Sequence, residues 1–149
     1  MAHSLVPNCL RMNTQQRIKD FLSSGPWAVA GASSNRSKYG NKVLRTYLQR
    51  AMDVYAVNPR ATEVEGVPCY PDLASLPDGV QGLSIITPPQ ITEQLVEAAA
   101  QKGIRKLWMQ PGAESSLALR RAEELGLSVI AGGPCLLVEL GFRESFAGR

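Results

Sequence analysis

Five short apolar segments, separated by stretches with helical spacing, constrain the fold of this 149-residue chain more than any other feature. We expect these segments to be buried strands, and they are residues 27–30, 53–57, 83–86, 107–109 and 127–131. Between the segments apolar residues recur at helical spacing, as in Ile91 and Leu95. Strands that alternate with helices in this way predict an α/β fold with a doubly wound, parallel, five-stranded sheet. Numbered in chain order, the strands are expected to lie in the order 3-2-1-4-5.

The remaining segments indicate how the chain is organised around these strands. We expect a single domain over residues 14–149, preceded by an N-terminal tail over residues 1–13 that has no clear periodicity. Thr14 is a candidate N-cap for a short helix that ends near Ser24. Residues 66–82 are rich in proline and glycine, which predicts a long connection with little regular structure.

Composition and a few single residues narrow the classes of function. The chain is 44% hydrophobic and 19% charged, as in ordinary globular proteins, and its net charge of +3 is too small for a general polyanion binder. His3 is the only histidine, which argues against a histidine-based catalytic or metal site. Three widely spaced cysteines, Cys9, Cys69 and Cys135, indicate neither a disulfide framework nor a zinc site and favour a reducing compartment. No apolar run reaches transmembrane length, so we expect a cytoplasmic protein that does not act at a membrane.

The segment between Gly31 and Gly40 connects the first expected strand to a helix and is a candidate anion-binding loop. A strand, a loop of small residues and a helix N-terminus together can hold a phosphate. Both glycines can adopt positive φ and let a ligand approach the backbone. Between Gly31 and Met52 the chain has no acidic residue and five basic ones, which are Arg36, Lys38, Lys42, Arg45 and Arg50. The spacing matches neither Gly-x-Gly-x-x-Gly nor a nucleotide-hydrolysing P-loop, so an ordinary strand-to-helix turn remains an alternative.

The residues after the second expected strand discriminate among nucleotide ligands. A dinucleotide site for NAD needs a carboxylate there to accept the hydrogens of the ribose hydroxyls. This chain has Asn58, Pro59 and Arg60 instead. Arg60 favours a ribose that carries an additional phosphate, as in NADP or coenzyme A, and a solvated loop arginine is the alternative.

Several motifs follow one another in an order typical of a known family. They are Gly31-Ala32-Ser33, Tyr39-Gly40-Asn41-Lys42-Val43, Val57-Asn58-Pro59-Arg60, Tyr70-Pro71-Asp72-Leu73, Leu76-Pro77 and Trp108-Met109-Gln110-Pro111-Gly112. Over roughly residues 14–140 the chain resembles the small coenzyme A-binding proteins, whose single domain is related to the N-terminal domain of the succinyl-CoA synthetase α subunit. The resemblance implies a Rossmann-like fold that binds coenzyme A along the carboxyl ends of the strands.

The resemblance and the strand ends together give the candidate ligand-binding residues. The loop would cover the pyrophosphate, Arg60 and Lys38 would meet the phosphorylated ribose, and Thr87 and Pro88 would lie against the adenine or the bend of the ligand. The full set is Gly31, Ala32, Ser33, Ser34, Asn35, Arg36, Lys38, Tyr39, Gly40, Asn58, Pro59, Arg60, Thr87, Pro88, Gln110, Pro111 and Cys135. No catalytic residue and no metal ligand is assigned.

The thiol end of the implied site departs from the family pattern. Many relatives end the fifth strand with Asp-Arg-Cys, where this chain has Gly133-Pro134-Cys135, and their Glu-His pair is Glu139-Leu140 here. Because Cys135 follows the last strand, it is a candidate to form a mixed disulfide with coenzyme A. A cysteine that only packs as a small apolar side chain is the alternative.

These observations favour a module that binds coenzyme A or an acyl-CoA without catalysis, as a carrier, sensor or binding subunit. The alternative is an NADP-dependent oxidoreductase or another nucleotide-cofactor enzyme, although the chain has no Tyr-x-x-x-Lys motif. A nucleic-acid partner is not expected, because the aromatic residues are not interleaved with the basic segment. The sequence leaves the oligomeric state open, with a homodimer among the options.

Overall fold

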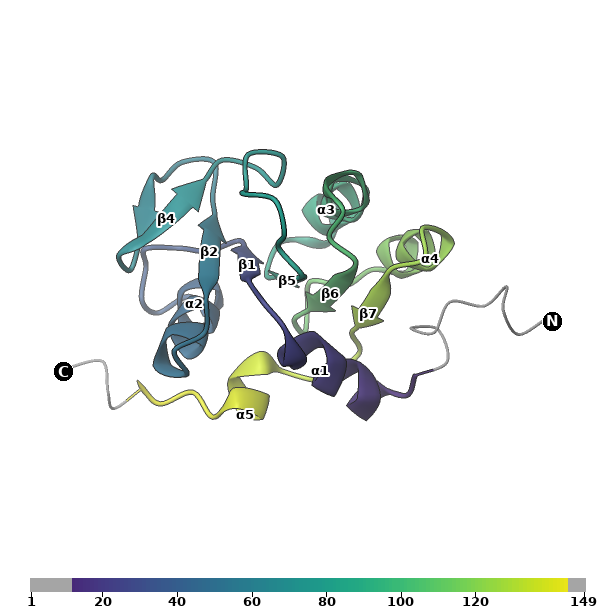
Figure 1. The fold of residues 1–149 in the computed structure, drawn as a ribbon, viewed down its shortest axis with the longest axis horizontal. Helices are drawn as coiled ribbons and strands as arrows, with labels where there is room; N and C mark the ends of the chain where they lie inside the picture. The colour runs from purple at the N-terminus through teal and green to yellow at the C-terminus, as the bar shows by residue number, and fades with distance from the viewer. Residues whose placement is uncertain (1–11, 145–149) are drawn as a thin grey trace.

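A twisted sheet of seven strands forms the centre of the computed structural model, which describes residues 12–144 (Figure 1). The strands are β1 (Trp27–Ala30), β2 (Val54–Val57), β3 (Glu63–Val64), β4 (Val67–Tyr70), β5 (Gly82–Ile85), β6 (Lys106–Met109) and β7 (Ser128–Ile130). The helices are α1 (Thr14–Ser23), α2 (Tyr39–Gln49), α3 (Pro89–Lys102), α4 (Ser116–Glu124) and α5 (Leu136–Leu140). The predicted α/β class is confirmed, and the sheet is mostly parallel, but it has seven strands and not five because the chain adds β3 and β4, of which β3 runs antiparallel to β4. His3 and Cys9 lie outside the described residues.

The strand order is β3-β4-β2-β1-β5-β6-β7, so the predicted order was wrong. The third expected strand, β5, pairs with β1 and not with β2, and Ala30 lies opposite Ile85. The reason is the hairpin of β3 and β4, whose second strand pairs in parallel with β2 and occupies the edge that the prediction had left for β5. With β4 beside β2, β5 pairs with β1 along the side that faces away from β2.

The hairpin itself contradicts the expectation of an unstructured connection after residue 66. Glu65 and Gly66 form its two-residue turn with φ values of +51° and +81°. Two consecutive residues at positive φ are the geometry of the tightest hairpin turns. Such a turn is usually signalled by Asn-Gly or Asp-Gly, and Glu-Gly does not carry that signal.

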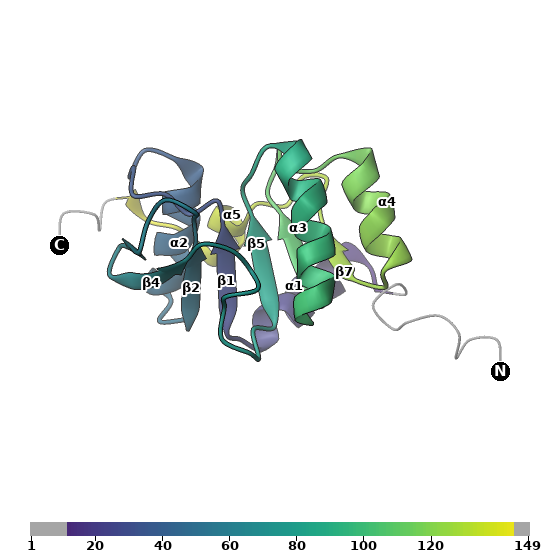
Figure 2. The same cartoon turned by 90° about the horizontal axis from the view of Figure 1, so that it is seen from above.

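The helices cover both faces of the sheet, as a doubly wound fold requires (Figure 2). On one face α3 and α4 pack through Val96 and Ala118. On the other face α1, α2 and α5 pack, with Phe21 of α1 edge-to-face against Trp108 at 5.4 Å between ring centroids. In α1 the N-cap is Asn13 and not Thr14, because the Asn13 side chain accepts a hydrogen bond from the Gln16 amide. Within residues 12–144 no helix has the length and apolarity needed to span a bilayer.

The parallel register places the carboxyl ends of neighbouring strands at one edge of the sheet. Ala30 is level with Val57 on one side and with Ile85 on the other, and Ile85 is level with Met109. The loops that follow β1, β2 and β5 therefore leave the sheet side by side. This edge positions the candidate site.

Candidate functional site

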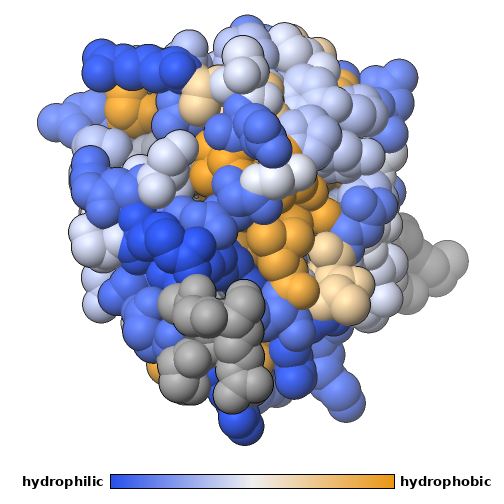
Figure 3. Space-filling view, turned by 90° about the vertical axis from the view of Figure 1, so that its left-hand side faces the viewer, coloured by the Kyte–Doolittle hydropathy of each residue, from blue (hydrophilic) through white to orange (hydrophobic). Residues whose placement is uncertain are grey.

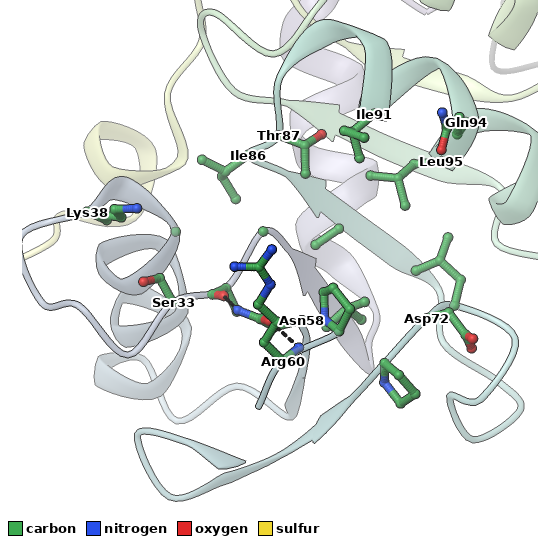
Figure 4. Close-up of a pocket in the computed structure, with 18 of the residues that line it drawn as sticks. Ser33, Lys38, Asn58, Arg60, Asp72, Ile86, Thr87, Ile91, Gln94 and Leu95 are labelled. Atoms are coloured by element: carbon green, nitrogen blue, oxygen red, sulfur yellow. Dashed lines mark hydrogen bonds between the residues drawn. The ribbon is translucent and has the colours of Figure 1, made fainter. Parts of the chain in front are cut away.

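A cavity of about 850 Å³ opens at the carboxyl edge of β1, β2 and β5 (Figure 4). Its size falls within the range of small-molecule sites. Of the residues predicted from the sequence, the cavity is lined by Gly31, Ala32, Ser33, Lys38, Tyr39, Gly40, Asn58, Pro59, Arg60 and Thr87. The predicted loop and the segment after β2 thus meet in one place.

Gly31 and Gly40 allow the loop after β1 to pack closely, but for different reasons. Gly31 has φ of +93°, as expected, and a Cβ there would overlap the carbonyl oxygen of Ile86. Gly40 lies in the first turn of α2 and does not have positive φ, so that part of the prediction was wrong. A Cβ on Gly40 would instead overlap the carbonyl oxygen of Gly31. Gly40 therefore allows close helix-to-strand packing, a known task of glycine in nucleotide-binding folds.

The first turn of α2 is open toward the cavity. Its N-cap is Lys38, and no side chain caps the amides of the turn. Tyr39 and Gly40, the first two residues of the helix, both line the cavity. The positive end of the helix dipole and these backbone amides are available to an anion at this position.

Much of the positive charge that the sequence places near the loop is neutralised. The Arg36 guanidinium pairs with Glu65 of the hairpin turn at 2.7 Å, and Arg45 pairs with Glu144 at 3.2 Å. Lys42 also contacts Glu144, at 3.6 Å. Both carboxylates come from outside the segment that the sequence analysis counted. Sequence spacing could not place them there.

Lys38 and Arg60 are the basic residues that line the cavity. Neither forms an ion pair with another described residue. Figure 4 shows the Arg60 side chain extending over the strand ends from the loop after β2.

Asn58 joins the loops that carry these cations. Its side-chain oxygen accepts a hydrogen bond from the Arg60 backbone amide at 2.7 Å. Its side-chain nitrogen donates a hydrogen bond to the Ala32 carbonyl oxygen at 2.7 Å. One side chain thus sets the turn at Arg60 and ties it to the loop after β1. Amide side chains commonly stabilise turns in this way.

The far wall of the cavity is apolar and was not predicted. Ile86 follows β5, and Ile91 and Leu95 project from α3 (Figure 4). Leu73, which precedes β5 in the chain, also lines the cavity. The helical spacing of Ile91 and Leu95 predicted a helix and gave no sign of a place at the cavity, where Ile91 is 42% exposed. Figure 3, which views the molecule from the side of β4 and α2, shows an apolar band bordered by hydrophilic surface. The other lining residues that the sequence analysis missed include Ser37, Asp72 and Gln94.

The remaining predicted residues do not line this cavity. Ser34, Asn35, Arg36 and Pro88 lie in the predicted loops but outside the lining, and so do Gln110, Pro111 and Cys135.

Gln110 is 4% exposed, and its side chain is occupied by two contacts to the segment after β7. Its amide nitrogen donates to the Cys135 sulfur at 3.3 Å, and its oxygen accepts the Leu136 amide at 2.9 Å. These contacts hold the start of α5 against the end of β6.

The cavity combines anion-binding groups with an apolar wall. In the part of the chain that the structure describes, no three His, Cys, Asp or Glu side chains gather as metal ligands would. Cys69 lies beside β2, and burial raises the pKa of its thiol against the opposing effect of its hydrogen bond to the Asn58 carbonyl. A raised pKa leaves less thiolate at neutral pH.

A family model described as a CoA binding domain matches residues 26–141. An ADP-forming acetate–CoA ligase I from Archaeoglobus fulgidus is 35% identical over 77 residues, which are 52% of this chain and 11% of the ligase. The chain thus spans about a tenth of that relative's length.

Two solved structures share the fold. A conserved hypothetical protein from Pyrococcus furiosus is 38% identical with a TM-score of 0.74, and the match covers 78% of this chain and 99% of that one. A dinucleotide-forming acetyl-coenzyme A synthetase 1 from Ca. Korarchaeum cryptofilum is 29% identical with a TM-score of 0.63, over 74% of this chain and 26% of that one. The family model covers the whole of the described sheet and every described helix except α1. The chain therefore belongs to the family of CoA-binding domains.

Proposed function

We propose that this protein binds coenzyme A or an acyl-CoA in the cavity at the carboxyl edge of β1, β2 and β5. One observation carries the proposal. Lys38 and Arg60 line the same cavity as the N-terminus of α2, where no side chain caps the backbone amides. Coenzyme A has a pyrophosphate and a ribose phosphate, and both need such groups. The helix N-terminus suits the pyrophosphate and Arg60 suits the ribose phosphate.

The apolar wall supports the same ligand. Leu73, Ile91 and Leu95 line the same cavity as the two cations and give it an apolar surface against which a planar base can pack. A ligand with separated anionic and apolar parts fits this arrangement better than a simple anion.

We further propose that the protein acts without catalysis, as a carrier, sensor or binding subunit. The chain matches only 11% of the acetate–CoA ligase, and we propose that it shares ligand binding with that protein and not the ligation reaction. No lining residue is a cysteine or a histidine, the side chains that most often act as nucleophile or base.

An NADP-dependent oxidoreductase is the second candidate, and Arg60 is the observation that favours it. The additional ribose phosphate of NADP would also attract this guanidinium. The two ligands differ beyond the pyrophosphate, where one carries nicotinamide and the other pantetheine. Competition between them therefore separates the candidates.

Mass spectrometry under native conditions first identifies any nucleotide that co-purifies with the protein. The proposal is then tested by calorimetric titration of the purified protein with coenzyme A, dephospho-CoA, NADP and NAD. We expect coenzyme A to bind most tightly and dephospho-CoA to bind more weakly. NADP binding as tight as coenzyme A would favour the oxidoreductase. Absence of coenzyme A binding to ligand-free protein would overturn the proposal.

A further inference from the structure

A nearly buried arginine lies behind the loop, outside the cavity. Arg45 of α2 is 5% exposed, and its guanidinium makes three hydrogen bonds. It donates to the Asn41 side-chain oxygen at 2.6 Å, to the Arg36 carbonyl at 3.0 Å and to Glu144 at 3.2 Å. The Phe142 ring lies 5.1 Å from the guanidinium carbon.

Asn41 extends this network to the other end of the loop. Its side chain is fully buried, and its nitrogen donates to the Ser33 carbonyl at 2.8 Å and to Glu65 at 2.9 Å. Ser33 and Arg36 are the positions at which α2 holds the loop by its backbone. Both hydrogen bonds are accepted by backbone carbonyl oxygens. Neither Arg45 nor Asn41 lines the cavity.

The direction of these hydrogen bonds matters for an anionic ligand. A carbonyl oxygen carries negative partial charge and repels phosphate, whereas a backbone N–H attracts it. Hydrogen bonds from the side chains of Asn41 and Arg45 hold the carbonyls of Ser33 and Arg36 toward α2. The network thereby favours a loop conformation that an anion can approach.

A buried guanidinium is a costly way to achieve stability alone. Apolar side chains of similar volume often replace buried ion pairs with no loss of stability. The inner face of α2 already packs through Val43, Leu44 and Tyr47. A side chain that serves only packing at position 45 would not need a planar fork of donors aimed at a loop carbonyl.

We infer that Arg45, together with Asn41, is a positioning residue that holds the loop after β1 in its anion-receiving conformation. This inference rests on the proposed function, because it assigns a task to residues behind the same site. Glu144 completes the arrangement by keeping the Arg45 charge paired. Loss of solvent contact acts to raise the pKa of Glu144, but hydrogen bonds and charges from Arg45 and Lys42 lower it below its ordinary value.

The test compares Arg45→Met with Arg120→Met. Arg120 is an exposed residue of α4, which packs on the other face of the sheet, so its replacement removes the same charge far from the loop. Both proteins are titrated with coenzyme A and with inorganic pyrophosphate, which probes the loop without the adenosine part. Backbone amide resonances of residues 33–40 are followed by NMR in each titration.

We expect Arg45→Met to weaken coenzyme A binding about tenfold or more, because the loop that contacts the ligand is no longer held in its binding conformation. Its loop resonances should be shifted before ligand is added and should no longer respond to pyrophosphate. Arg120→Met should match the parent protein in both titrations. Arg45→Lys keeps the charge but cannot reproduce the fork, so it should restore binding only in part.

Equal binding by Arg45→Met and the parent protein, with a lowered melting temperature, would reduce Arg45 to a structural residue and overturn the inference. If Arg45→Met does not fold, Asn41→Ala carries the test, because it removes the tie to Ser33 and leaves Arg45 paired with Glu144. A parent protein that binds pyrophosphate at the loop but not coenzyme A would refute the proposed function and leave the inference standing.

Discussion

Gly40 in the first turn of α2 lies so close to the carbonyl oxygen of Gly31 that no Cβ fits between them. Gly31 is the first residue after β1, so this contact fixes where the helix begins relative to the strand. The two glycines therefore determine the position of the loop and of the helix N-terminus that borders the cavity.

Replacement of Gly40 by Ala is expected to destabilise the protein. In an ordinary helix the same change stabilises by up to about 1 kcal/mol, because alanine loses less backbone entropy on folding. Here the added methyl group would displace the backbone of Gly31, and overpacking of this kind costs about 1–3 kcal/mol. Thermal unfolding measures the change, and a melting temperature above that of the parent protein would contradict the packing argument. Loss of ligand binding by Gly40→Val would then reflect a displaced helix as well as a filled site.

Arg60 is expected to discriminate coenzyme A from dephospho-CoA. Because the Arg60 side chain is exposed, its contact with the ribose phosphate should lie near the low end of charge-assisted contacts, at about 1.5 kcal/mol. Arg60→Met should therefore weaken coenzyme A binding roughly tenfold and leave dephospho-CoA binding unchanged. Calorimetry measures the binding of coenzyme A and of dephospho-CoA to Arg60→Met and to the parent protein. Equal losses for the two ligands would show that Arg60 contacts another part of the ligand.

Asp72 at the rim of the cavity should make stability depend on pH through Ser75. The Ser75 hydroxyl at 2.7 Å, followed by the Ser75 amide at 2.9 Å, lowers the pKa of the Asp72 carboxyl. A lowered folded-state pKa contributes stability above the ordinary pKa of aspartate, about 3.9, and this stability is lost as the pH falls through the folded-state value. Ser75→Ala should thus melt at a lower temperature than the parent protein at neutral pH, and the gap should narrow in acid. A gap that is independent of pH would indicate that the hydroxyl acts without the carboxylate.

Cys135 is expected to remain unmodified by oxidised coenzyme A. The Cys135 sulfur accepts a hydrogen bond from the Gln110 side-chain amide, and Cys135 does not line the cavity. Intact-mass measurement after incubation with oxidised coenzyme A should show no adduct on Cys135, and Cys135→Ser should bind coenzyme A as the parent protein does. An adduct that disappears in Cys135→Ser would mean that the bound thiol reaches the end of β7, in agreement with the mixed disulfide considered from the sequence.

The sequence by itself determined the strands of the parallel sheet and several residues of the candidate site. The apolar runs specify β1, β2, β5, β6 and β7, because buried parallel strands need continuous apolar side chains. Gly31 and Arg60 were identified as candidate binding residues because each lies in the turn that follows a strand. Turns can be recognised from the sequence because their residue types are local signals. The resemblance to coenzyme A-binding proteins also rests on short, ordered motifs.

Only the tertiary structure decided which of these residues share a site. Glu65 and Glu144 neutralise Arg36 and Arg45 from distant parts of the chain. The hairpin of β3 and β4 displaces β5 to the far side of β1, which brings Ile91 and Leu95 over the cavity and leaves Gln110 and Cys135 outside its lining. Strand pairing and ion pairing depend on contacts between segments that are remote in the chain, and the periodicity of any one segment carries no information about its neighbours in space.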